Sequence, residues 1–212
     1  MEVSEIIIYL CIVLPIAPII LAMRDKHFKR FILFMTLGFT ICLVSSQINT
    51  LLIDYLNMDL LRYSTAISPI IEELLKAIPI IYFAIFYAEK DDEILPLAFA
   101  IGIGFAILES VVIYCDNMDY ATISWAIIRG FGASLMHSVC TAMIAMGINY
   151  VINKKGNLFK GIVGLFALAI IYHGIFNAFV QSKFSFIALL LPLLLFIPIN
   201  IIEYKKKKYF EK

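Results

Sequence analysis

The apolar residues of this chain come in seven long blocks, and this spacing constrains the fold more than any other feature of the sequence. Each block has about 20 residues, the length with which an α-helix crosses roughly 30 Å of hydrocarbon. Hydrophobic residues make up 62% of the 212 residues and charged residues 16%. A water-soluble fold could not bury that much apolar surface. We therefore predict an all-α bundle of transmembrane helices.

The predicted spans follow one another closely and leave no room for a separate soluble domain. They cover residues 3–22, 31–53, 66–88, 94–115, 121–151, 158–180 and 184–202. The fifth span is the longest, so it has to tilt, protrude or break near Gly130 and Gly132. We predict one integral membrane domain over residues 1–212.

Basic residues predict the orientation of the bundle, because short loops rich in Lys and Arg stay in the cytoplasm. The loops after the first, third and fifth spans and the C-terminal tail carry most of these residues, among them Arg24, Lys90, Lys154 and Lys205. We therefore predict an N-terminus outside the cell and a cytoplasmic C-terminus. The net charge of +1 offers no soluble basic face for nucleic acid. Abundant Ile, Lys and Asn suggest a bacterium, and hence a multi-pass protein of its cytoplasmic membrane.

Seven ionisable residues lie inside the predicted spans, where lipid disfavours them. They are Glu72, Glu73, Lys76, Glu109, Arg129, His137 and His173. A charged side chain near the bilayer centre costs roughly 3 kcal/mol on insertion scales, so such groups normally face the bundle interior and pair. We interpret the set as a functional site. For any single member, the alternative is a purely structural role in locking two helices together.

The depth of these residues can be counted from the predicted outer end of each span at about 1.5 Å per residue. Five of the seven lie about 9 to 12 Å below that end, namely Glu72, Glu73, Glu109, Arg129 and His173. His137 lies deeper, near mid-membrane, and a tilted span would shift it by several ångströms. The count predicts a polar cavity in the outer half of the membrane, open to extracytoplasmic water.

Helical spacing and charge give this set an internal order. Glu72 and Glu73 are four and three residues before Lys76, so either carboxylate can share a helix face with the ammonium. Arg129 keeps its proton and needs a carboxylate, for which Glu109 is the natural partner. Three glutamates against two cations leave one carboxylate without a dedicated cation. That carboxylate can act on a bound water as a general base or acid, or a metal ion can neutralise it.

Short motifs at these residues resemble the PrsW intramembrane proteases, which are related to type II CAAX prenyl endopeptidases and bacteriocin-processing membrane proteases. They are EExxK at Glu72–Lys76, FxxxE at Phe105–Glu109, a late His motif at His173–Asn177, and RGFGASLMHS with Arg129 and His137. The resemblance covers residues 68–179, a catalytic core of four helices. CAAX endopeptidases usually carry a longer EExxxR motif and a His at the position of Glu109, so a prenylated substrate is not indicated.

The resemblance implies proteolysis of a membrane-anchored substrate. PrsW-like proteins typically make the first cut of an anti-sigma factor on its extracytoplasmic side, as part of a stress response. The expected partners are thus a single-pass membrane protein and the lipid bilayer. In this interpretation Glu72 or Glu73 activates the attacking water, and His173, with Asn177 or His137, stabilises the tetrahedral oxyanion.

Four further residues would support this chemistry. Glu109 would orient a histidine or a water, Lys76 and Arg129 would hold the carboxylates ionised, and Phe105 belongs to the second motif. Whether a metal takes part stays open, because no HExxH helix is present. The residues able to give zinc the oxygen and nitrogen ligands it accepts are Glu73, Glu109, His137 and His173.

Two other classes of function use the same buried charges. A proton- or ion-coupled carrier would employ them as a relay, although the sequence lacks an inverted repeat. A non-catalytic scaffold would use them to hold partner helices. Transport depends on an ion gradient and needs no protein substrate, whereas proteolysis yields two defined fragments, so a cleavage assay separates these classes.

Overall fold

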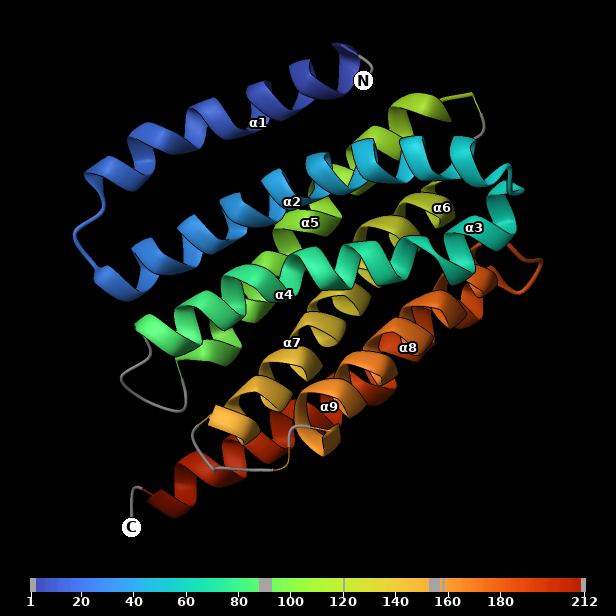
Figure 1. Cartoon of the computed structure of the whole chain (residues 1–212). Helices are drawn as coiled ribbons and strands as arrows, with labels where there is room; N and C mark the ends of the chain where they lie inside the picture. The colour runs from blue at the N-terminus through green and yellow to red at the C-terminus, as the bar shows by residue number, and fades with distance from the viewer. Residues whose placement is uncertain (1–2, 88–92, 120, 153–156, 158, 211–212) are drawn as a thin grey trace.

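A computed structural model describes residues 3–87, 93–119, 121–152, 157 and 159–210, and every regular element in this part of the chain is a helix. Figure 1 shows the helices running side by side as one bundle. In chain order they are α1 (Val3–Ala22), α2 (Lys26–Leu56), α3 (Leu60–Ala66), α4 (Ser68–Phe86), α5 (Ile94–Asp116), α6 (Ile123–Ile127), η1 (Ile128–Gly132), α7 (Ala133–Ile152), η2 (Phe159–Val163), α8 (Gly164–Val180) and α9 (Ser185–Phe210). The all-α prediction is confirmed.

Five helical segments in the described part of the chain are long and apolar enough to cross a membrane, so the protein is a multi-pass membrane protein. They are Ser4–Ala22, Lys26–Leu56, Ile94–Asp116, Ile123–Ile152 and Gly161–Val180. The other two predicted spans correspond to α4 and α9. Helix α4 has 19 residues but contains two glutamates and a lysine, and the apolar part of α9, Ser185–Ile199, is shorter.

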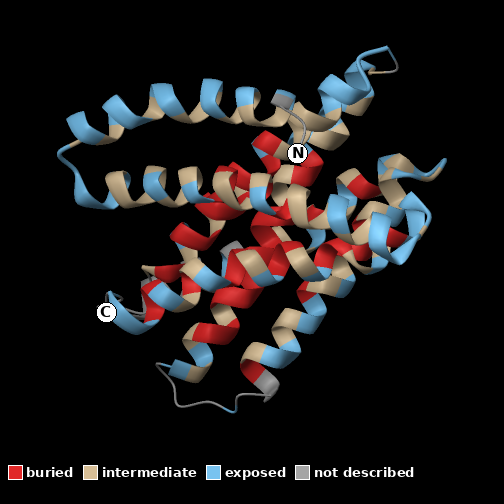
Figure 2. Ribbon diagram, turned by 45° about the horizontal axis from the view of Figure 1, so that its top comes forward, coloured by how far each residue is buried: buried red, intermediate tan, exposed pale blue. Residues whose placement is uncertain are grey.

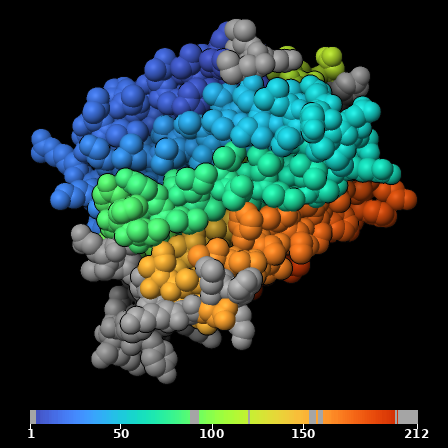
Figure 3. Space-filling model, in the orientation of Figure 1, coloured from blue at the N-terminus to red at the C-terminus, as the bar shows by residue number. Residues whose placement is uncertain are grey.

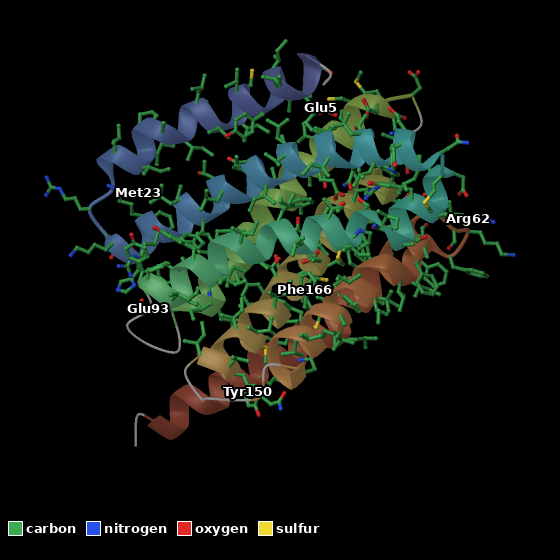
Figure 4. The ribbon with its side chains drawn as sticks, viewed as in Figure 1. Glu5, Met23, Arg62, Glu93, Tyr150 and Phe166 are labelled. Carbon is green, nitrogen blue, oxygen red and sulfur yellow. The ribbon has the colours of Figure 1, made fainter. Side chains whose placement is uncertain are left out.

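The two ends of the bundle are easily told apart. Figure 4 labels Glu5 and Arg62 near one end, which we call the α3 end, and Met23, Glu93 and Tyr150 near the opposite end. Helix α1 starts at the α3 end and α9 finishes at the opposite one (Figure 1). Which end faces the cytoplasm stays a prediction. Of the basic residues that support it, Lys90 and Lys154 lie outside the described residues, as do the predicted span ends at positions 88 and 158.

Small residues let α5 approach its neighbours closely toward the opposite end. A Cβ atom at Gly104 would collide with the backbone of Met35 on α2, and one at Gly102 would collide with the backbone of Ser138 on α7. Ala98 and Ala100 are likewise fully buried. Figure 2 shows buried residues concentrated at the centre of the bundle. Here backbone packs on backbone, as small residues allow in membrane bundles.

The helix geometry of the long fifth predicted span changes near Gly130 and Gly132, where we expected a break. Residues Ile128–Gly132 form a turn of π-helix between α6 and α7. Hydroxyl groups bond to two carbonyl groups of this turn, since Ser110 Oγ donates to the Arg129 carbonyl at 3.1 Å and Ser134 Oγ to the Gly130 carbonyl at 2.5 Å. Single π-turns of this kind often occur at functional sites.

Helix α3 is the one element that the apolar pattern did not predict. Asp59 caps its N-terminus by accepting a hydrogen bond from the Arg62 amide at 3.0 Å. On the face seen in Figure 3, α1, α2, α4 and α8 lie next to one another. Helix α1 contributes no buried residue within its membrane-spanning stretch, and its Tyr9 hydroxyl lies 2.9 Å from Thr40 Oγ1 of α2.

Candidate active site

Four helices bring the predicted polar residues together inside the bundle. The cluster combines Glu72, Glu73 and Lys76 of α4 with Glu109 of α5, His137 of α7 and His173 of α8. Glu73, Lys76 and both histidines are completely buried, and Glu72 is 5% exposed. Helix α4 starts with Pro69 in its first turn, where a proline stabilises a helix. The four-helix core implied by the resemblance is therefore the part of the fold that builds this cluster.

Lys76 lies at the centre of the cluster. Its Nζ is 2.8 Å from Glu73 Oε1 and 2.8 Å from Nδ1 of His137, and it lies 4.0 Å from the centre of the Phe105 ring. An ammonium only donates hydrogen bonds, so Nδ1 of His137 accepts. The His137 proton is consequently on Nε2, which donates to Glu109 Oε2 at 3.1 Å. This network fixes the tautomer and the ring orientation of His137.

Glu73 holds the second histidine. Its Oε1 lies 2.9 Å from Nδ1 of His173, so the same oxygen serves the ammonium of Lys76 and the imidazole. A carboxylate accepts, so Nδ1 of His173 donates, and in the neutral imidazole Nε2 then carries a free lone pair. That nitrogen has no hydrogen-bond partner in the described part of the chain, and it lies 3.7 Å from Glu72 Oε2.

Glu72 has one oxygen bonded and one oxygen free. Ser68, one turn earlier on α4, donates to Glu72 Oε1 at 2.5 Å. The second oxygen, Oε2, is buried and has no hydrogen-bond partner among the residues that the structure describes. It points to the free nitrogen of His173. An unpaired buried carboxylate oxygen is unfavourable unless a ligand binds to it.

A cavity of about 530 Å³ opens beside the cluster at the α3 end. Helices α2, α3, α4, α5 and α8 supply most of its wall, with Glu5 of α1 and Trp125 of α6 at the edge. Glu72 and Glu109 line it, whereas Glu73, Lys76 and the two histidines lie behind them. Glu72 is thus the member of the glutamate pair that a molecule in the cavity can reach.

Arg129 and Asn177 also line this cavity. Arg129 Nη1 lies 4.0 Å from Glu109 Oε2, so the predicted pairing is present as a long ion pair, and the arginine Nε is buried without a partner in the described residues. Asn177 donates its amide to the Ser64 carbonyl of α3 at 2.9 Å. It ties α3 to α8.

The sequence from α2 to α9 decides the family. Residues 26–202 match the PrsW family of intramembrane metalloproteases. The chain belongs to this family. No match is found among curated proteins or solved structures. The PrsW match leaves out α1 and contains every residue of the cluster, so the resemblance of the short motifs is confirmed over a longer stretch than the core from 68 to 179.

The polar cluster of this PrsW protein fits a divalent metal ion. One ligand atom each of Glu72, His137 and His173 lie within 4.8 Å of one another. Glu72 Oε2 and His173 Nε2 are free, and the bond from His173 to Glu73 is the outer-shell contact that metal-ligating histidines usually make. His137 would have to free one of its ring nitrogens, because Lys76 occupies Nδ1 and the Nε2 proton is donated to Glu109. The group contains two of the four predicted ligands and adds Glu72, while Glu73 and Glu109 bind the histidines instead.

Three residues of the PrsW site were not selected from the sequence. Ser68 binds Glu72, Asn49 of α2 donates to Ser68 Oγ at 2.9 Å, and Tyr63 of α3 donates to Asn49 at 2.9 Å. A serine four residues before a buried glutamate was a usable signal, because the two share a helix face. No sequence signal marks Asn49 or Tyr63, since their contacts depend on how α2, α3 and α4 pack.

Proposed function

We propose that this intramembrane protease cuts a membrane-anchored protein on its extracytoplasmic side and that Glu72 is the general base. The observation that carries the proposal is the free Oε2 of Glu72, buried in the wall of the cavity and 3.7 Å from the free Nε2 of His173. The sequence left Glu72 and Glu73 as equal choices. Each glutamate has one oxygen without a partner in the described residues, and we favour Glu72 because it lines the cavity, whereas Glu73 does not and its Oε1 is taken by both Lys76 and His173.

The proposed reaction uses a water held between these two free atoms. A separation of 3.7 Å lets one water hydrogen-bond to Glu72 Oε2 and to His173 Nε2 together. Glu72 takes a proton from this water as the water oxygen attacks the carbonyl carbon of the peptide bond. The C–N bond then breaks, and Glu72 returns the proton to the leaving nitrogen. The two products carry a new carboxylate and a new amine.

The oxyanion formed in this step needs a donor. His137 offers the Nε2–H that now points to Glu109, and Arg129 offers a guanidinium at the cavity wall. His173 is better placed to hold the water, because its only proton bonds to Glu73. If Glu72, His137 and His173 instead held a zinc-like ion, Glu72 would be a ligand and not the base, and the ion would supply the acidification of the attacking water.

The position of the cavity supports a substrate cut close to the membrane surface. The α3 end is the end that the distribution of basic residues predicts to be extracytoplasmic, and the cavity reaches it through α3 and α6. A single-pass protein crossing the bilayer beside the bundle would present its juxtamembrane segment at this height. An anti-sigma factor of a bacterium has this architecture, and we propose it as the substrate class.

The test is co-expression with a panel of single-pass anti-sigma factors, with fragment size as the readout. Glu72→Gln is expected to lower the cleavage rate by about 10²- to 10⁴-fold, the contribution of a general base. Glu73→Gln keeps an acceptor for His173 and is expected to lose less. Glu93→Gln, in an ion pair at the opposite end, is the matched control. All variants are compared at equal membrane levels.

Equal cleavage by native protein and Glu72→Gln would remove Glu72 as the base, and equal cleavage in cells without the protein would favour the carrier or scaffold. A carrier would move protons or ions in vesicles without any protein substrate, and a scaffold would bind its partner equally well with Gln at position 72. Cleavage deep inside the bilayer or on the cytoplasmic side would contradict the predicted orientation, even with Glu72 confirmed.

A further inference from the structure

Four side chains from three helices form a continuous chain of hydrogen bonds that ends on Glu72. Tyr63 Oη donates to Asn49 Oδ1 at 2.9 Å, Asn49 Nδ2 donates to Ser68 Oγ at 2.9 Å, and Ser68 Oγ donates to Glu72 Oε1 at 2.5 Å. All four residues line the cavity. The Tyr63 side chain is 3% exposed, although its helix lies at the surface of the bundle.

The direction of each bond in this chain is determined by the chemistry of its members. A carboxylate only accepts, so the single hydroxyl proton of Ser68 goes to Glu72. The hydroxyl oxygen then accepts from the Asn49 amide NH₂, which turns the amide oxygen toward Tyr63. Tyr63 can satisfy that oxygen only by donating its phenol proton. One arrangement of protons therefore satisfies all three bonds.

We propose that Tyr63 and Asn49 are positioning residues for the catalytic glutamate. Acting through Ser68, they keep Glu72 Oε1 bonded and leave Oε2 as the free oxygen that faces His173. The inference deepens the proposed function and rests on the role of Glu72 in it. Without the chain, the Ser68 hydroxyl could rotate toward its own helix backbone, as serines commonly do, and the carboxylate could turn either oxygen to the cavity.

The chain orients Glu72 and does not conduct protons. Asn49 interrupts it, because a carboxamide neither gains nor loses a proton near neutral pH. The chain begins at Tyr63 of α3. Asn177 and Gln181 of α8 hold this helix in place through hydrogen bonds to Ser64. The wall of the cavity and the base are thereby connected by side chains on α3, α2 and α4.

Infrared spectroscopy of the purified full-length protein tests the chain without any substrate. The carboxylate band that disappears in Glu72→Gln belongs to Glu72, and its frequency reports the hydrogen bond to Oε1. Ser68→Val is expected to shift this band, and Tyr63→Phe and Asn49→Leu are expected to shift it in the same direction by smaller amounts. Ser68→Thr, which keeps the hydroxyl at nearly the shape of valine, leaves it in place.

Cleavage kinetics test the consequence for catalysis, using the anti-sigma factor that the native chain cuts. We expect Ser68→Val to lower kcat by about ten- to a hundredfold, as for the loss of a hydrogen bond to a charged group, and Tyr63→Phe by about three- to tenfold, with KM changed less than about twofold. Tyr63→Phe added to Ser68→Val is expected to cost nothing further, because the chain is already broken. Tyr55→Phe, on an 85% exposed residue at the same end, is the control.

Unchanged Glu72 bands in Tyr63→Phe and Asn49→Leu would overturn the inference, as would additive losses of kcat or a loss confined to KM. These outcomes are distinct from a failure of the proposed function. If Glu72→Gln cuts normally, the base is misassigned, while the infrared bands still report whether the chain holds the carboxylate.

Discussion

Toward the end opposite α3, α5 packs against α2 and α7 through Gly102, Gly104 and buried alanines, whereas one turn beyond them the same helix presents Glu109 to a cavity. In the first half, which we call the closed half, backbone packs on backbone around Gly102 and Gly104. The second half contains Glu72 and His173 with buried atoms that the described residues leave unpaired. The backbone contacts of the closed half therefore fix the spacing of α2, α5 and α7. The second half, which contains the candidate site, keeps the unpaired atoms on which the proposed reaction depends.

The largest expected difference between the two halves concerns metal. If Glu72, His137 and His173 hold a divalent ion in place of the bridging water, the purified native protein should contain one equivalent of it, His173→Ala none, and Glu93→Gln at the opposite end as much as the native chain. Chelation should then stop cleavage and leave the helical fold intact, because the closed half does not depend on the ion. Metal content by mass spectrometry gives the answer. Cleavage that survives complete chelation would exclude a metal requirement.

The next largest effect concerns Lys76, which joins the two halves. Lys76→Met leaves the Glu73 carboxylate buried beside an uncharged side chain, and removal of one member of a buried pair costs about 3 to 5 kcal/mol. Adding Glu73→Gln should restore part of this stability but not the activity. Unfolding in mild detergent, followed by tryptophan fluorescence or circular dichroism, measures both variants. A Lys76→Met variant as stable as the native chain would show that Lys76 is not charged in the fold.

Within the closed half, Gly104→Val is expected to force α5 away from Met35 of α2. Overpacking of this kind costs about 1 to 3 kcal/mol, and cleavage should fall in proportion to the folded fraction. Gly130→Ala is the matched control, because a Cβ atom there meets nothing within 4 Å. If Gly104→Val lowers activity at unchanged stability, the two halves are coupled more tightly than the packing implies.

The smallest expected effect concerns Asn177 at the cavity wall. Asn177→Leu removes the bond to the Ser64 carbonyl, worth about 1 kcal/mol, and loosens α3. We expect KM for the protein substrate to rise about fivefold with kcat nearly unchanged, as for a loss of about 1 kcal/mol in binding. A fall in kcat at constant KM would instead support the predicted role of Asn177 in oxyanion stabilisation.

The sequence predicted most of the fold and most members of the site, for reasons that concern single helices. Long apolar blocks gave the spans, and the spacing of Glu73 and Lys76 gave their ion pair, since both depend on helix geometry alone. Counting from position 121 placed His137 about 24 Å deep. It bonds to Lys76, which is about 12 Å from the start of α4. The bond shows that His137 belongs to the cluster, which a count along single helices could not decide.

The missing parts depend on contacts between helices. Helix α3 is too short and too polar to show an apolar period, and Asn49 is a residue whose role follows only from the neighbours that packing gives it. The choice between Glu72 and Glu73 is of the same kind. Adjacent residues on a helix point in different directions, and only the packing of the helices around the cavity determines which carboxylate lines it.

The polar content of α4 also affects how the protein is made. Three charged side chains raise the cost of placing this segment in lipid by roughly 9 kcal/mol on insertion scales, and the helix itself offers them only the Glu73–Lys76 pair and the hydrogen bond from Ser68 to Glu72. Its other partners, His137 and His173, come 61 residues after Lys76 and 100 residues after Glu73. Helix α4 can therefore pair these side chains only after the ribosome has synthesised α7 and α8. Its stable insertion is thus coupled to the packing of those later helices.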